Sequence, residues 1–517
     1  MYENLNIIIN PEVLLSIIVL SLVLYGINLS TLKMSIGVLF VIGIMIKVDS
    51  FDTGLSLNGL LTINSWIIIS KIIIIIGSIS ILLMGGGGET IMGREEWHFT
   101  SGSPEVKCHK PERSSGSWPG RTQTAFGYSP AINQTTFGSP ERSSGSSQQS
   151  KPYQSFPILV LMVALSSLLL VSSVNWLSIY LAIELQTLTL FILAALKKDS
   201  AYGTEAGLKY FVLGAVSSGL FLFGCALLYG LTGETSIQGI NSVLTADVGK
   251  ILITISLLFK LSAAPFHMWA PDVYDGAPTP TTALLATVPK VGVFSILVQI
   301  GPVSNVILIC AVLSIIYGAI GALNQTKIKR LLAYSGIGHM GFILFGIAIG
   351  TFESIQASLI YMVIYIIISI CGFSVILSLN LAKALIIEVG GLSRDNPTLA
   401  LTLALTFLST AGIPPLAGFL SKWLILLSGV ASGYYLICVV AVISSVIAGV
   451  YYVRLVQIIY FQADYSIFIW KKILRKEKRI DLNKSLLIGS TFFIILFLMI
   501  SPNFLLQITH DATISLY

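Results

Sequence analysis

About fourteen apolar runs, most of them roughly twenty residues long, recur along this chain of 517 residues. They lie near residues 12–30, 32–47, 64–84, 156–173, 174–196, 206–230, 249–268, 279–301, 303–323, 328–350, 354–380, 398–425, 430–461 and 484–506. A run of about 20 apolar residues crosses the hydrocarbon core of a bilayer as an α-helix. The sequence therefore predicts an all-α membrane protein with about fourteen transmembrane helices.

The composition supports this class and excludes others. Hydrophobic residues make up 55% of the chain and charged residues only 10%, whereas a soluble protein has about 25% charged residues. The net charge of +6 does not indicate nucleic-acid binding, because the basic residues cluster in loops rather than on one face. The five cysteines show no CxxC spacing, and no nucleotide-binding glycine motif stands in the right context. We therefore expect this chain itself to bind no metal, iron–sulfur cluster or nucleotide.

The basic residues gather in the loops that follow odd-numbered spans. They include Lys197, Lys198, Lys327, Lys329, Arg330, Lys383, Arg394 and the Lys and Arg residues within 471–479. Loops on the cytoplasmic or matrix side of a membrane carry the excess of Lys and Arg, so these loops are predicted to lie there. With fourteen spans, both termini then lie on the opposite side.

Residues 86–150 interrupt the apolar pattern. They are rich in Ser, Gly, Pro, Thr and Gln, and the segment PERSSGS occurs twice, at 111–117 and 140–146. Such a segment cannot bury enough apolar surface to offset the entropy lost on ordering, so we expect a disordered insert on the matrix side. The chain then divides into N-terminal helices (1–85), the insert (86–150) and the main helical part (151–517).

Lone charged side chains lie inside several apolar spans. Lys260 and Lys290 are the clearest cases, and Glu184 and Lys422 lie in similar settings. A charge at bilayer depth costs roughly 2.5–3.5 kcal/mol, and such groups usually mark an ion or proton path. A nearby carboxylate changes the proton affinity of an amine, so Glu184 is predicted to switch Lys260 between proton acceptor and donor. The alternative is a structural glutamate that hydrogen-bonds a neighbouring helix.

Two histidines and a charged pair have less specific settings. His339 lies at membrane depth and fits either a proton carrier or a packing residue. His267 lies nearer the end of a span, at a proton exit or simply at the membrane interface. Glu205 and Lys209 are four residues apart, which fits a plain helix-stabilising pair.

Prolines interrupt two of the spans. Pro265 follows Lys260 closely, and Pro414 and Pro415 precede Lys422. A proline inside a helix removes a hydrogen bond and clashes with the preceding turn, so neither span can run unbroken. Broken spans in corresponding positions of two halves are typical of inverted-repeat transporters. We predict repeats of five helices, spans 4–8 and 9–13, with discontinuous helices 7 and 12.

Several segments resemble a known family. They are ELQTLTLFILAAL (184–196), TEAGLKYFVLGAVSSGLFLFGCALLYGLTG (204–233), KLSAAPFHMWAPDVYDGAPTP (260–280), KIKRLLAYSGIGHMG (327–341) and AGIPPLAGFLSKW (411–423). Together they resemble subunit 2 of respiratory complex I, in the mitochondrially encoded form closest to plant and fungal versions. The resemblance runs from about residue 156 to the C-terminus, weakens over 1–85 and is absent from 86–150.

The resemblance implies an antiporter-like subunit with fourteen helices, broken helices 7 and 12, and a role in proton translocation. His339 matches the histidine of the family's SSIGH-type motif, in which Gly336 here replaces a serine. The insert departs from the family, where a short loop is expected. The proton relay that the resemblance implies consists of Glu184 (helix 5), Lys260 (helix 7), Lys290 (helix 8), Lys422 (helix 12) and His339.

These observations predict a proton-translocating membrane subunit of NADH:ubiquinone oxidoreductase in the mitochondrial inner membrane. NAD, FMN, iron–sulfur clusters and ubiquinone would then be bound by partner subunits rather than by this chain. The alternatives are a subunit of a multi-component cation/proton antiporter, a non-conducting structural subunit of the membrane arm, and the related plastid complex. The ELQ and EAGLKYF segments favour the mitochondrial form over the plastid one.

Overall fold

The structure is a computed structural model. It describes residues 11–25, 31–48, 54–56, 61–85, 155–197, 200–237, 247–301, 303–379, 381, 384–462 and 480–517. The predicted insert at 86–150 lies outside these residues, so its disorder and its side of the membrane stay predictions.

The described chain is almost entirely helical. The longer helices are α2 (Pro11–Tyr25), α3 (Thr31–Val48), α4 (Ser65–Gly85), α5 (Ser155–Ser172), α6 (Trp176–Ala194), α7 (Ala201–Thr232), α9 (Asp247–Lys260), α10 (Trp269–Gly276), α11 (Thr279–Ala286), α12 (Val288–Ile300), α13 (Ser304–Ala322), α14 (Ile328–Ile349), α15 (Phe352–Ser378), α17 (Pro397–Ala411), α18 (Ala417–Ala431), α19 (Tyr435–Phe461), α21 (Leu482–Phe497) and α22 (Asn503–Ile514). Two short elements, η3 (Ile386–Val389) and α16 (Leu392–Asp395), precede α17. Each predicted span overlaps one helix or two successive helices, which confirms the predicted all-α class.

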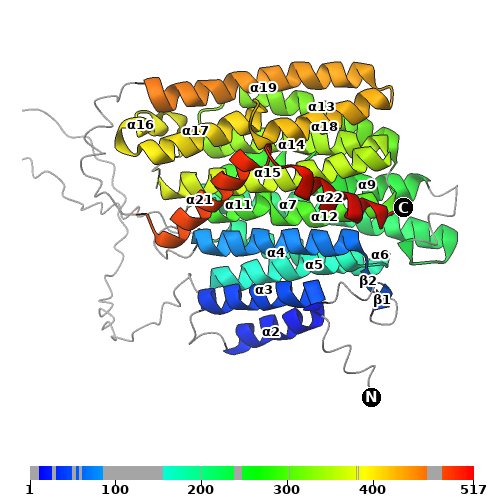
Figure 1. Ribbon diagram of the computed structural model, residues 1–517. Helices are drawn as coiled ribbons and strands as arrows, with labels where there is room; N and C mark the ends of the chain where they lie inside the picture. The colour runs from blue at the N-terminus through cyan, green and yellow to red at the C-terminus, as the bar shows by residue number, and fades with distance from the viewer. Residues whose placement is uncertain are drawn as a thin grey trace, which may run out of the picture. The chain divides into compact units, whose positions relative to one another are not determined.

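Among the described residues, nine helical segments are long and apolar enough to cross a membrane, and four shorter apolar helices accompany them. Figure 1 shows most of these helices side by side with nearly parallel axes, while α21 and α22 run obliquely against α15 and α4. In the apolar stretch of the α11–α12 segment 89% of the residues are buried, and in that of α15 83% are. In the apolar stretch of α19 only 28% are buried. The α11–α12 segment and α15 therefore form the centre of the fold, and α19 turns most of its surface outward.

Both predicted breaks are present. Between α9 and α10 the chain makes turns around Pro265, and Ser262 has a positive φ of 58°. Between α17 and α18 it passes through Gly412, with φ 84°, before Pro414 and Pro415. The missing proline N–H groups prevent continuous helical hydrogen bonding in both places.

The structure adds a third interruption that the sequence analysis did not predict. The span expected at 279–301 is divided at Thr287 into α11 and α12. Pro289 lies in the first turn of α12, where a proline is tolerated because its missing N–H would be unpaired anyway. The interruption places Lys290 at the beginning of a helix rather than in the middle of one.

The helices follow the predicted repeat. The first five-span unit is α5, α6, α7, the α9–α10 pair and the α11–α12 pair; the second is α13, α14, α15, the α17–α18 pair and α19. The helix broken by prolines is the fourth member of each unit. Because five is an odd number, the second unit enters the membrane from the side opposite to the first. This order agrees with inverted repeats.

Charged side chains meet at one end of the helices. Asp275 on α10 pairs with Lys327 at 2.7 Å, and Asp272 pairs with Lys209 at 2.8 Å and with Arg330 at 3.2 Å. The loops after spans 5 and 9 therefore lie at the same end as the end of span 7, as the charge pattern predicted. The side of the membrane that this end faces stays a prediction.

A small β-hairpin is a further feature that the sequence analysis did not predict. The strands β1 (Gly54–Ser56) and β2 (Leu61–Ile63) pair antiparallel, with Leu55 opposite Thr62, directly before α4. Its strands are too short to give the alternating apolar pattern by which a strand is recognised in a sequence.

Candidate functional site

Lys260 is the last residue of α9, at the point where the seventh span breaks. It is 9% exposed, and its ammonium donates a 2.7 Å hydrogen bond to the hydroxyl of Thr187 on α6. The unpaired carbonyls at the C-terminus of a helix carry partial negative charge, which stabilises a nearby cation. The break therefore creates a place inside the membrane where this amine can hold a proton.

Glu184 lies on α6, one turn before Thr187, and is half-buried. Tyr180, one turn further back, interacts through its hydroxyl with the Glu184 carboxylate. The carboxylate also interacts electrostatically with Lys260, but the hydrogen bond of the ammonium goes to Thr187. Glu184 can therefore act on Lys260 through its charge, with Thr187 as the direct partner.

Lys290 lies in the first turn of α12 and is only 1% exposed. Its ammonium is 3.5 Å from the hydroxyl of Tyr365 on α15 and 5.5 Å from the centre of the Tyr365 ring. A buried ammonium costs free energy unless polar groups replace its water, and the hydroxyl and the π-face of Tyr365 do so in part. Tyr365 is thus the direct partner of this lysine.

His339 lies on α14 beside two tyrosines of α15. Its Nδ1 is 2.8 Å from the Tyr361 hydroxyl, and the ring centres of His339 and Tyr365 are 5.5 Å apart. Because Tyr365 also contacts Lys290, the histidine and the lysine are linked through α15. The predicted residues of helices 8 and 10 therefore belong to one polar cluster.

Lys422 reaches from α18 back to the end of α17. Its ammonium donates a 2.8 Å hydrogen bond to the carbonyl of Ala411 and lies 5.8 Å from the centre of the Phe342 ring. Ala411 is the last residue of α17, so this lysine, like Lys260, lies at the C-terminal end of the first half of a broken span.

Two cavities surround His339. The larger, of about 40 Å³, is lined in part by Ser335, His339, Tyr361, Tyr365, Thr410 and Ser421. The smaller, of about 20 Å³, is lined in part by Ser335, His339, Thr410, Lys422, Tyr451 and Tyr452. A buried water needs about 10–15 Å³ of such space and polar partners, and both cavities meet these conditions. Water in them would join the polar groups around His339 to Lys422.

The Lys260 region and the Lys290 region are less directly joined. Within the described residues, the ammonium groups of Lys260 and Lys290 share no hydrogen-bond partner. Tyr274 on α10 is buried beside Tyr365, and its hydroxyl has no hydrogen-bond partner in the described part of the chain. A buried hydroxyl of this kind is normally satisfied by water, so the Tyr274 hydroxyl offers a hydrogen-bonding site for a water molecule.

The remaining sequence candidates lie at the edge of this region. His267 is in the break between α9 and α10, with its ring centre 5.5 Å from that of Tyr317. Lys209 pairs with Glu205 at 2.7 Å, as the helical spacing predicted, and also with Asp272. The latter contact ties α7 to α10.

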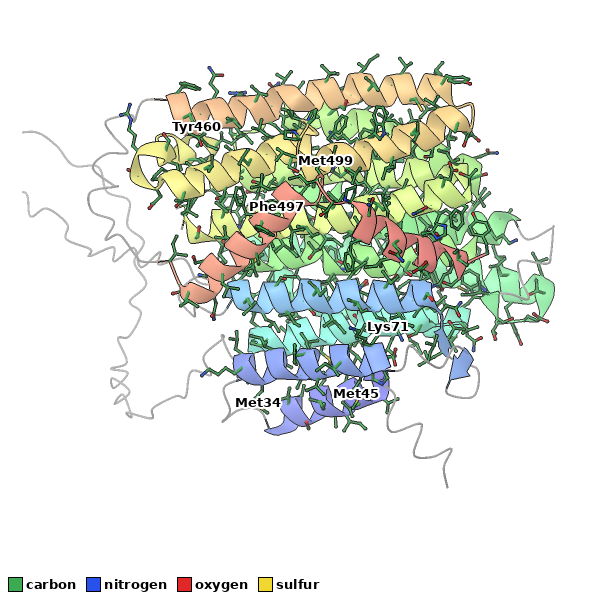
Figure 2. All side chains as sticks on the ribbon, in the orientation of Figure 1. Met34, Met45, Lys71, Tyr460, Phe497 and Met499 are labelled. Carbon is green, nitrogen blue, oxygen red and sulfur yellow. The ribbon has the colours of Figure 1, made fainter. Side chains whose placement is uncertain are left out.

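Sequence reasoning missed a buried ion pair in the N-terminal helices. Lys71 on α4 pairs with Glu12 on α2, and the two side chains are 6% and 3% exposed. The hydroxyl of Ser172 on α5 is 3.5 Å from the same carboxylate. Figure 2 shows Lys71 near the end of α4 that follows β2. A lone lysine in the apolar segment SWIIISKIIIII was the available signal, the same one that singled out Lys260.

A family model described as "NADH:quinone oxidoreductase/Mrp antiporter, TM" matches residues 173–448, which is more than half of the chain. The chain belongs to this family. The region matched to the NADH:quinone oxidoreductase/Mrp antiporter family contains all five residues of the predicted relay, whereas Glu12 and Lys71 lie outside it.

Two relatives match a larger share of the chain than the family model does. The chain is 66% identical over 374 residues to NADH-ubiquinone oxidoreductase chain 2 of Metridium senile, covering 70% of this chain and 97% of that protein. It is 40% identical over 381 residues to the chain 2 protein of Oenothera berteroana, covering 70% of this chain and 77% of that one. These relatives confirm the resemblance to subunit 2 of respiratory complex I.

The solved structure of respiratory complex I from Thermus thermophilus contains a chain of the same fold. The TM-score is 0.75 at 24% identity, and the match covers 96% of this chain and 98% of that one. The likeness of fold therefore extends to described helices outside residues 173–448 as well.

Proposed function

We propose that this chain is the proton-translocating antiporter-like membrane subunit of NADH:ubiquinone oxidoreductase. Its family membership and the names of its relatives support the enzyme. The observation that supports proton transfer is the placement of two buried lysines at the broken spans. Lys260 is the last residue of α9, and the Lys422 ammonium bonds the carbonyl of Ala411, the last residue of α17. Two buried amines at helix breaks, with hydroxyls and cavities between the helices, make a path on which protons can be held and passed.

In this proposal Glu184 controls the first carrier. When Glu184 is ionised it stabilises the charged form of Lys260, and when it is protonated or moves away that stabilisation is lost. The proton of Lys260 is then released past Thr187 into the path. Lys290, His339 and Lys422 pass it on through the hydroxyls of α15 and water in the cavities.

The source of energy lies outside this chain. Electron transfer from NADH to ubiquinone, through FMN and iron–sulfur clusters, would take place in partner subunits, and its effect would reach this subunit as a change of charge or of helix position. The partners in this proposal are the other membrane-arm subunits of complex I.

The proposal places the chain in the mitochondrial inner membrane as a multi-pass protein with both termini on the intermembrane-space side. The charge pattern of the loops supports this orientation. A short epitope tag after Tyr517 would be accessible to antibody in intact mitoplasts and protected in sealed inside-out vesicles. The reverse result would invert the topology.

A second candidate function is cation/proton exchange, which the Mrp antiporter part of the family description favours. Purification of the protein with its partners distinguishes cation/proton exchange from the respiratory function. Association with an NADH-oxidising assembly supports the respiratory subunit, whereas association with other antiporter-type chains alone supports the exchanger.

Proton pumping by a Lys260→Ala variant tests the proposal against a purely structural role. The variant is expected to assemble, because removing a buried amine eases membrane insertion. Its pumping should fall by about a hundredfold, the lower range for loss of a proton-transfer group. The matched control is Lys250→Ala, a lysine in the first turn of the same helix. Normal proton movement per NADH oxidised in Lys260→Ala would refute the relay.

A further inference from the structure

The two cavities around His339 share three residues. Ser335, His339 and Thr410 line both of them. Tyr361 and Tyr365 line only the larger cavity, on the side of Lys290, and Lys422 lines only the smaller one. The shared residues therefore lie between the Tyr365 side of the larger cavity and the Lys422 side of the smaller one.

The shared residues offer two different kinds of group. His339 presents an imidazole whose Nδ1 is engaged with the Tyr361 hydroxyl at 2.8 Å. Ser335 lies one turn earlier on the same helix, and its hydroxyl is hydrogen-bonded to the hydroxyl of Tyr452 on α19. The Tyr452 hydroxyl also interacts with Thr410 on α17 and with the neighbouring Tyr451. Hydroxyls from three helices thus meet beside the imidazole.

Tyr452 lies on the buried face of its helix. Most of α19 is turned outward, yet Tyr452 is 1% exposed, and its ring stacks against Phe407 with 6.3 Å between centres. The stacking fixes the ring, so the hydroxyl is held at the smaller cavity, against Ser335, which lines both cavities. A buried hydroxyl is both a donor and an acceptor, which is what a proton-transfer chain needs.

We propose that Ser335, Tyr452 and Thr410 form a hydroxyl route that carries protons between the two cavities in parallel with His339. The proposal rests on the proton-translocating function argued above. In each step an oxygen accepts a proton from the group before it, water or hydroxyl, and releases its own proton to the group after it. One O–H bond forms for each that breaks, so one proton crosses and no electron moves. Rotation of the hydroxyls then restores the first arrangement.

A parallel route makes a specific prediction for combined substitutions. Either route alone should sustain pumping, so Tyr452→Phe and His339→Gln should each lower the pumping rate by at most about twofold. The double variant should lower it by at least about tenfold, far more than the product of the single effects, because residues that share a task are not additive. Tyr452→Phe keeps the ring, and with it the contact with Phe407.

The measurement is the initial rate of proton uptake per NADH oxidised, in vesicles that contain the complete enzyme. Tyr210→Phe is the control, because Tyr210 is a buried tyrosine of α7 outside both linings. A double variant no slower than the slower single variant overturns the parallel route. So does a loss of pumping in the double variant that merely follows a loss of assembled enzyme and is absent when Ser335→Ala or Thr410→Val replaces Tyr452→Phe beside His339→Gln.

The outcome is separable from that of the proposed function. Normal pumping by Lys260→Ala would remove the function, whatever the double variant does. Loss of pumping in Lys260→Ala together with normal pumping in the Tyr452/His339 double variant would leave the function intact and exclude only the hydroxyl route.

Discussion

The ammonium of Lys422 donates a 2.8 Å hydrogen bond to the carbonyl of Ala411 across the break between α17 and α18. In the other repeat, Lys260 itself ends α9. The two lysines come from opposite sides of their breaks. The Lys422 ammonium lies at the C-terminus of α17, where the helix dipole favours positive charge, whereas the Lys260 ammonium bonds Thr187 on α6. Both repeats therefore have a buried lysine at a helix break, but its ammonium has a different partner in each.

A substitution at position 422 can test whether Lys422 carries protons or only supplies a fixed positive charge. Lys422→Arg keeps a cation that can bond the Ala411 carbonyl, but a guanidinium is not deprotonated in proteins. We expect Lys422→Arg to assemble normally and to pump at least about a hundredfold more slowly. Proton uptake by vesicles with equal amounts of assembled enzyme is the measurement. Full pumping by the arginine variant would mean that only the charge matters there.

The half-buried Glu184 gives a second prediction. Glu184→Gln fills a similar volume but cannot change charge, so its control over Lys260 is lost. Pumping should fall more than the amount of inserted protein does. Glu184→Leu serves as the comparison, since it also removes hydrogen bonding. If Glu184→Gln pumps normally and Glu184→Leu fails only in assembly, the glutamate is a packing residue.

The buried pair of Lys71 and Glu12 predicts a stability effect rather than a pumping effect. Removing one partner leaves an uncompensated buried charge, which costs about 3–5 kcal/mol, whereas replacing both with apolar residues is often neutral. Lys71→Met and Glu12→Leu should each lower the temperature at which the subunit is lost from the solubilised enzyme, and the double variant should recover it. Continued instability of the double variant would point to a role beyond charge balance.

The contact between α17 and α18 depends on a glycine. A Cβ added at Gly418 would lie 1.8 Å from the carbonyl oxygen of Ser409, whereas one added at Gly449 on α19 would meet nothing within 4 Å. Gly418→Ala must push the two half-helices apart, so little assembled enzyme should form. Gly449→Ala should assemble like the wild type. Native gel electrophoresis of both variants compares the amounts, and equal amounts would show that the break can open without cost.

The sequence by itself determined the membrane class, the order of the spans, the breaks at Pro265 and Pro414, and the charged relay candidates. These follow from strong local rules. Lipid excludes unpaired backbone groups, prolines interrupt helices, and a charge within an apolar span is costly enough to be conspicuous.

The tertiary structure alone decided which groups those charges meet. Thr187 as the partner of Lys260, Tyr365 as the partner of Lys290, and the pair of Ser335 and Tyr452 have no sequence signature. The reason is physical: a Ser or Thr hydroxyl can bond the carbonyl three or four residues earlier in its own helix, as Thr187 does with Ile183. Such residues cross the membrane at little cost, and only the packing of neighbouring helices determines which hydroxyls face the cavities.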